Sequence, residues 1–110
     1  MEENLYDSSE LIELRRAGVQ AEGFTTILNL IEFPKAVELI RLGILYPTRE
    51  GFDNALLWSA EMLKQGTPVP ALDLVISAIT VRLGLQLVTR DQHFKVIRAV
   101  VKDLRVQVKR

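Results

Sequence analysis

Apolar residues recur along this chain of 110 residues with two spacings, one typical of strands and the other typical of helices. Short runs of apolar and β-branched residues between polar residues or glycines indicate strands, whereas apolar residues three or four positions apart indicate one face of a helix. The first pattern predicts strands at 4–6, 24–26, 85–88 and 104–108. Each predicted strand is short, and the last alternates apolar and polar positions as a half-buried strand does.

Helical spacing fills the segments between the predicted strands. It predicts helices at 8–17, 27–33, 35–42, 48–65, 70–83 and 93–101. Gly18, Gly43, Gly66 and Gly84 follow four of these segments, as residues that end helices commonly do, and Pro34 separates the second helix from the third. The chain therefore alternates between strands and helices, with a helical region in its middle.

Strands that alternate with helices pair in parallel, and right-handed crossovers place the helices on both faces of the sheet. The element order thus predicts an α/β fold: a three-layer α/β/α sandwich around a central, mostly parallel sheet of four or five short strands. The chain has no internal repeat, low-complexity tract or linker, so we expect one domain spanning 1–110. In such sheets, ligands bind beyond the carboxyl ends of the strands.

Composition narrows the chemistry that this fold can support. The absence of cysteine excludes disulfides and thiolate sites, and a single histidine, His93, excludes a multi-histidine metal site. Basic and acidic residues number 14 each, so contact with a nucleic acid would need a local patch. The amino-terminal residues lack the features of a signal peptide, and no apolar run could span a bilayer. We therefore expect a cytoplasmic protein that does not associate with membranes.

Four acidic residues stand where the predicted fold would bring them to one edge of the sheet. Asp7 and Asp91 follow predicted strands, while Glu32 and Asp73 lie on polar faces of otherwise apolar helices. Clustered carboxylates repel one another unless a cation neutralises them, and Mg²⁺ or Mn²⁺ prefers oxygen ligands. This constellation predicts a carboxylate-held Mg²⁺ or Mn²⁺ site of the kind that acts on phosphodiesters.

Each acid taken alone also has a purely structural explanation. Asp7 and Asp91 can cap the helices that follow them, and Asp73 can stabilise a helix amino terminus through the helix dipole. We expect His93 to start a helix or lie on the surface, with no catalytic role. Tyr46 and Trp58 are expected in the core or at an interface, since two isolated aromatic residues do not form a nucleic-acid surface.

The four acids lie in four segments that can be compared as a set with known families. The segments are LYDSSELI at 5–12, TTILNLIEF at 25–33, PVPALDLVISA at 68–78 and LVTRDQHF at 87–94. In this order they resemble the PIN-domain family and, within it, the toxin of VapBC toxin–antitoxin pairs. The match spans nearly the whole chain. Ser8 stands where the family most often has threonine, and the stretch between Asp7 and Glu32 is short for the family.

The resemblance implies a metal-dependent endoribonuclease, the toxin of a type II toxin–antitoxin system. Asp7 and Asp91 would bind the metal directly, Glu32 and Asp73 would bind it directly or through water, and Glu32 or Asp73 could accept a proton from the attacking water. Ser9 and Thr89 stand beside the acids and could orient them, although helix or turn capping explains them equally well.

The resemblance also implies partners: an RNA substrate, a cognate antitoxin that inserts a basic side chain among the acids, and a second copy of the chain. The helical middle, with Leu57, Trp58 and Met62, is the candidate surface for the homodimer. Two alternatives remain, a catalytically silent PIN-like module that binds RNA or protein and a receiver-like phosphoacceptor. The second is disfavoured because no lysine is expected at a strand end beside the acids.

Overall fold

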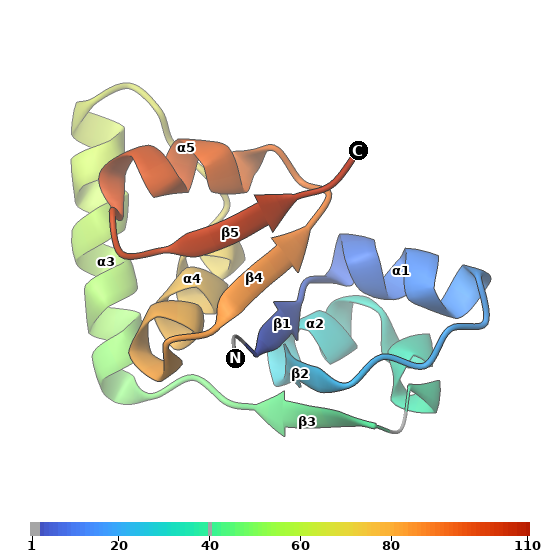
Figure 1. Ribbon diagram of the computed structural model, residues 1–110. Helices are drawn as coiled ribbons and strands as arrows, with labels where there is room; N and C mark the ends of the chain where they lie inside the picture. Colours follow the sequence, from blue (N-terminus) through green and yellow to red (C-terminus); the bar gives the residue numbers. More distant parts are fainter. Residues whose placement is uncertain (1–2, 40) are drawn as a thin grey trace.

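A computed structural model of the chain, which describes residues 3–39 and 41–110, contains a five-stranded sheet in which every neighbouring pair is parallel (Figure 1). Met1, Glu2 and Ile40 lie outside the described residues. The strands are β1 (Asn4–Tyr6), β2 (Gly23–Thr26), β3 (Leu42–Leu45), β4 (Gln86–Thr89) and β5 (Arg105–Val108), and their spatial order is β3-β2-β1-β4-β5. The predicted α/β class with a central parallel sheet is confirmed.

Helices occupy the connections between the strands. They are α1 (Ser8–Arg16), α2 (Ile27–Glu32), the 3₁₀ helix η1 (Pro34–Glu38), α3 (Arg49–Lys64), α4 (Ala71–Leu83) and α5 (His93–Val100). Thr26 and Thr48 cap α2 and α3 by accepting hydrogen bonds from the backbone N–H groups of Asn29 and Gly51. Gly84 ends α4 with a φ of 65°, a left-handed conformation that favours glycine.

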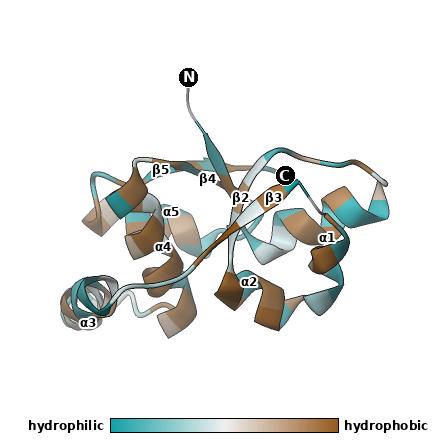
Figure 2. Ribbon diagram, turned by 90° about the horizontal axis from the view of Figure 1, so that it is seen from below, coloured by the Kyte–Doolittle hydropathy of each residue, from teal (hydrophilic) through white to brown (hydrophobic). Residues whose placement is uncertain are grey.

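Two hydrophobic clusters pack the helices around the sheet. One joins α3, α4 and α5 to the strands, with Phe94, Ile76 and Leu87 fully buried. The other joins α1, α2 and η1 around Leu11 and Leu30. Figure 1 shows these two groups of helices on opposite sides of the picture, and Figure 2 shows hydrophobic residues concentrated on α2 and α4. No helix in the described ranges is long and apolar enough to cross a membrane.

The segment 35–42, predicted as a helix, is the one element that was predicted wrongly. Pro34 starts only the short 3₁₀ helix η1, and the chain then enters β3, which pairs with β2 along four residues. Gly43 suits this pairing because a Cβ atom there would lie 2.9 Å from the ring of Phe24. Gly43, which we interpreted as the end of a helix, is instead a strand residue that lets β2 and β3 approach closely.

Candidate metal centre at the carboxyl edge of the sheet

β1 and β4 lie side by side and parallel, so the residues that follow them meet at the same edge of the sheet. Tyr6 is paired with Val88, and the backbone N–H of Asp7 donates to the carbonyl of Val88 over 3.0 Å. Thr89 is the last residue of β4, and Asp91 follows two positions later. The fold therefore brings Asp7 and Asp91, which are 84 positions apart in the sequence, to one edge.

The Asp7 carboxylate is 5% exposed and accepts hydrogen bonds from three neutral side chains. Asn29 Nδ2 donates to Oδ1 over 2.9 Å, while the hydroxyls of Thr89 and Ser9 donate to Oδ2 over 2.8 and 3.2 Å. Asp7 occupies the N-cap position of α1, yet its side chain makes no capping hydrogen bond. Helix capping therefore does not explain the carboxylate, which α2, β4 and α1 jointly hold at the edge.

Asp73 approaches Asp7 from the first turn of α4 and lacks comparable partners. Its side chain is 14% exposed, and Oδ2 is a fully buried oxygen with no hydrogen-bond partner in the part of the chain described. Burial, together with the nearby negative charges of Asp91 and Asp7, raises the pKa of Asp73 from 3.8 to about 6, although His93 acts in the opposite direction. The fold thus holds Asp73 where its negative charge is costly.

Asp91 and His93 complete the group that surrounds Asp73. His93 Nδ1 lies 3.4 Å from Asp73 Oδ2 and 3.3 Å from Asp91 Oδ1. Candidate ligand atoms of the three residues all lie within 4.8 Å of one another. Asp91 Oδ1 also accepts a hydrogen bond from the backbone N–H of His93, as expected of a residue at a helix start. His93, to which we assigned no role, is thus both the first residue of α5 and a member of this group.

Glu32 lies at the same edge but outside the group formed by Asp73, Asp91 and His93. It is the last residue of α2, is exposed, and accepts a hydrogen bond from the Ser8 hydroxyl over 2.8 Å. Asn29 Nδ2 donates to the same hydroxyl over 2.9 Å and also bonds Asp7. Glu32 is therefore connected to Asp7 through Ser8 and Asn29. Asn29 stands three residues before Glu32, one helical turn away, and this spacing is the sequence signal that could have identified Asn29 as part of the site.

A buried ion cluster beside the acids was not anticipated from the sequence. Glu10 is 2% exposed, and its two carboxylate oxygens lie 2.9 Å from Arg90 Nε and 2.6 Å from Lys109 Nζ. Ser9, its neighbour, accepts a hydrogen bond from the backbone N–H of Arg90 over 2.8 Å. The cluster ties α1 to the residues that follow β4 and β5, which include Thr89 and Asp91.

Lys109 follows β5 directly, but the acid that it pairs with is Glu10, which is not one of the four predicted acids. The receiver-like alternative fails on topology. Receiver domains have the strand order 2-1-3-4-5, whereas this sheet has the order 3-2-1-4-5. The strand order therefore separates this fold from the receiver fold.

The residues at the edge fit a hard divalent cation. Their donors are carboxylate oxygens with a single imidazole nitrogen, a set compatible with Mg²⁺ or Mn²⁺. The unpartnered Asp73 oxygen and its raised pKa are an unfavourable arrangement that a bound cation would relieve. We therefore treat Asp7, Asp73, Asp91 and His93 as the candidate metal centre.

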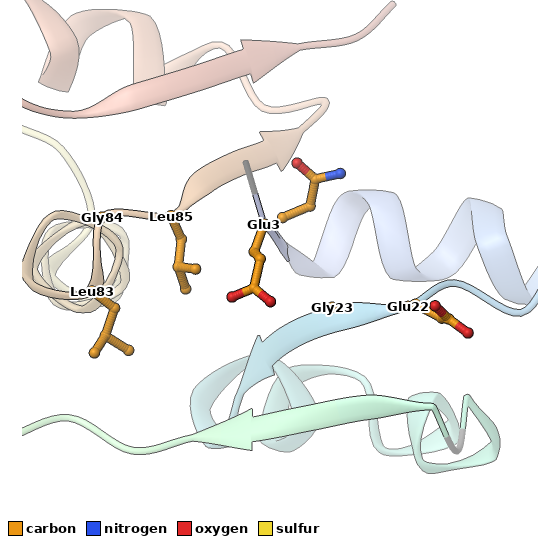
Figure 3. A pocket seen from close by; sticks show the side chains of 7 residues that line it. Glu3, Glu22, Gly23, Leu83, Gly84 and Leu85 are labelled. Carbon is orange, nitrogen blue, oxygen red and sulfur yellow. The ribbon is translucent and has the colours of Figure 1, made fainter. Parts of the chain in front are cut away.

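A separate cavity of about 550 Å³ lies at the other end of the strands (Figure 3). Its lining comes from the residues before or at the starts of β1, β2 and β4 and from the end of α4: Glu3, Asn4, Glu22, Gly23, Leu83, Gly84 and Leu85. None of the four predicted acids contributes to it. The cavity at the amino ends of the strands is therefore not part of the candidate metal centre.

Comparison with known proteins supports the fold. No family model and no curated protein matches the chain. Among solved structures, DNA-bound VapBC from Salmonella typhimurium matches with a TM-score of 0.70 and 19% identity over 98% of both chains. VapBC2 from Rickettsia felis, bound to a promoter DNA fragment, matches with a TM-score of 0.77 and 12% identity over 97% of this chain and 98% of that chain. VapBC-5 from Mycobacterium tuberculosis has a TM-score of 0.69 and 18% identity, with 97% of both chains covered. The predicted PIN-like fold is confirmed.

Proposed function

We propose that residues 1–110 form one domain that acts as a metal-dependent endoribonuclease, the toxin of a VapBC-type pair. The observation that carries this proposal is the convergence of Asp7, Asp73 and Asp91, with an unpartnered buried oxygen on Asp73. This edge belongs to a fold shared with structures of VapBC toxin–antitoxin systems. Carboxylate sites for Mg²⁺ or Mn²⁺ commonly serve phosphodiester chemistry.

The side chains divide the work of hydrolysis in this proposal. Asp7 and Asp91 would hold the cation directly, Asp73 and Glu32 would hold it directly or through water, and Ser9 and Thr89 keep Asp7 oriented through their hydrogen bonds. A bound Mg²⁺ or Mn²⁺ supplies charge stabilisation to the phosphodiester and lowers the pKa of a nearby water. Glu32, which is exposed and outside the group around Asp73, is the carboxylate that accepts a proton from the attacking water.

The proposal includes two protein partners. The cited neighbours are VapBC complexes, and an antitoxin that presents a basic side chain to this acidic edge would be attracted electrostatically. A homodimer would use α3, which exposes Leu57 together with Phe52 and Leu56. Trp58 is only partly exposed and packs on the core, and Met62 is fully buried, so Met62 does not belong to the candidate dimer surface.

Cleavage of a labelled structured RNA pool tests the nuclease. The purified chain with Mn²⁺ is compared with the same sample in chelator and with the Asp7→Asn and Asp91→Asn variants. Asp103→Asn, which removes an exposed carboxylate outside the site, is the matched control. We expect cleavage by the unmodified chain and the control alone. Equal cleavage in all samples would indicate a contaminant and reject the assignment.

The catalytically silent alternative is separated by metal binding. A cation that binds only the folded state raises stability by RT ln(1 + [L]/Kd), so Mn²⁺ should raise the melting temperature of the unmodified chain and the Asp103→Asn control. The increase should be lost in Asp91→Asn. A melting temperature that does not respond to Mn²⁺ in the unmodified chain, with no RNA cleavage, would favour the silent module.

A further inference from the structure

Positive charge is distributed very unevenly along this nominally neutral chain. Residues 90–110 carry seven lysine or arginine residues and two acidic residues, a net charge of +5, whereas residues 1–89 carry seven and twelve, a net charge of −5. The basic segment forms α5, β5 and their flanks, which lie together at the carboxyl terminus of the fold (Figure 1, orange to red). A local basic surface therefore exists although the net charge is zero.

Internal contacts use some of these cations. Arg90 and Lys109 are paired with the buried Glu10, and Arg105 donates to the backbone carbonyl of Gly84. Their charge is therefore at least partly committed to holding the fold. The remaining basic residues of the segment are the ones to consider for binding a ligand.

Lys95, Arg98 and Lys102 form the basic stripe, and all three are exposed. Lys95 and Arg98, three residues apart, lie on one side of α5, and Lys102 lies in the turn after the helix. None of the three forms an ion pair within the part of the chain described, and Asp103, the nearest acid in sequence, is exposed. The basic stripe thus presents three exposed positive charges that form no ion pair within the described residues.

The basic stripe and the candidate metal centre share α5. The helix starts at His93, whose imidazole contacts both Asp73 and Asp91, and Lys95 lies in the first turn of the same helix, on a different side from His93. An acidic edge without a cation repels the phosphates of a nucleic acid, so a strand that enters it needs positive charge nearby. Three such cations can neutralise about three phosphates of a strand.

We propose that the basic stripe Lys95–Arg98–Lys102 binds the phosphate backbone of the RNA strand and guides it to the acidic edge. This inference rests on the proposed function, because it identifies where the substrate of that same site lies. Contacts of this kind are made to phosphates, so the surface contributes affinity and orientation and does not select particular bases.

Salt dependence of RNA binding tests the basic stripe. The probe is a fluorescein-labelled single-stranded RNA of about 20 nucleotides, measured by anisotropy in chelator between 50 and 200 mM salt. Chelator keeps binding separate from cleavage. The stripe variant Lys95→Gln/Arg98→Gln/Lys102→Gln is compared with a control, Lys35→Gln/Arg49→Gln/Lys64→Gln, which removes three exposed basic side chains on other elements. Thermal melting of both variants checks that they are folded.

Loss of three phosphate contacts should make the slope of log affinity against log salt shallower by about two. The ratio of the RNA affinity of the unmodified chain to that of the stripe variant should then fall by about 20-fold when the salt concentration rises fourfold. The control should keep the slope of the unmodified chain. Equal slopes for the two variants, or tighter binding of duplex DNA than of RNA through the same stripe, would overturn the inference.

Cleavage separates this inference from the nuclease assignment. If RNA affinity depends on the basic stripe while no sample cleaves RNA, the binding surface stands and the proposed nuclease fails. If the unmodified chain and the stripe variant cleave with the same KM, the nuclease stands and the basic stripe fails. If both proposals hold, the stripe variant should cleave with a raised KM that approaches the normal value at low salt.

Discussion

Ionisation of the Asp73 carboxyl is costly to this fold, so Asp73→Asn should stabilise the metal-free protein. Its pKa in the folded state is about 6, raised from 3.8 by burial, by Asp91 and by Asp7. The folded protein therefore binds this proton more tightly than the unfolded chain does. The sign follows from linkage: stability falls as the pH rises from about 4 to about 6, and the full cost is present above that range.

The expected magnitude follows from the size of the shift. A shift of about two pKa units costs about 3 kcal/mol at pH 7.5, where the carboxyl must ionise, but only about 1 kcal/mol at pH 4.5. Asparagine is neutral at both pH values. The advantage of Asp73→Asn in the free energy of unfolding should thus grow by about 2 kcal/mol between the two conditions. With a urea m-value of about 2 kcal/mol per M, that is about 1 M in the midpoint.

Urea unfolding followed by Trp58 fluorescence measures this difference in chelator at both pH values. Asp103→Asn, an exposed carboxylate in the turn before β5, controls for the loss of one negative charge. An Asp73→Asn variant that is less stable at pH 7.5, or whose advantage is the same at pH 4.5, would refute the reasoning. Saturating Mn²⁺ should reduce or reverse the advantage, because only the unmodified chain keeps all its carboxylate ligands.

Two further substitutions test the neighbouring contacts. Glu10→Gln should lower the free energy of unfolding by about 1–3 kcal/mol, because it leaves two cations facing a neutral buried side chain. The control Glu38→Gln breaks an exposed pair with Arg15 and should lower it by less than about 1 kcal/mol. Equal losses for the two variants in urea unfolding would contradict this prediction. Thr89→Val should lower the free energy of unfolding by about 1–3 kcal/mol and weaken Mn²⁺ binding, as measured by calorimetry, because the Thr89 hydroxyl bonds both Asp7 and the backbone of Asp91. Thr89→Ser keeps the hydroxyl and should retain both properties. A serine variant that behaves like the valine variant would argue against a role for the hydroxyl.

The sequence pattern predicts most of this fold because, in most segments, the periodicity of apolar residues agrees with the positions of the residues that begin and end helices. Gly84 ends α4 as predicted, and Thr26 and Thr48 cap α2 and α3 close to the predicted starts of these helices. β3 was missed because its pairing with β2 is a tertiary contact and because Pro34 and Gly43 also fit the start and end of a helix. At the edge of a sheet, the partner strand decides the conformation.

In the candidate site, too, the sequence predicts what depends on local pattern and misses what depends on tertiary contacts. Asp7 and Asp91 could be assigned from sequence because they follow strands, and the carboxyl ends of parallel strands share one edge. The partners of Glu10 could not, since Arg90 and Lys109 are 80 and 99 positions away along the chain. His93 was dismissed because a residue at a helix start has an adequate local explanation. Its contact with Asp73 depends on how α4 and α5 pack.

Asp7 and Asp73 differ in how many hydrogen bonds their carboxylates accept, and this difference favours an edge built around a cation. Asp7 receives three hydrogen bonds from neutral side chains, so its burial is compensated within the protein. Asp73 is less deeply buried, yet its Oδ2 atom is buried and accepts no hydrogen bond, with His93 Nδ1 3.4 Å away. If the edge served stability alone, a neutral asparagine at position 73 would remove the cost of the charge. A carboxylate whose negative charge the protein compensates only in part, through His93, fits an edge where a cation or its water completes the contact, and the Mn²⁺ arm of the urea experiment on Asp73→Asn tests for that contact.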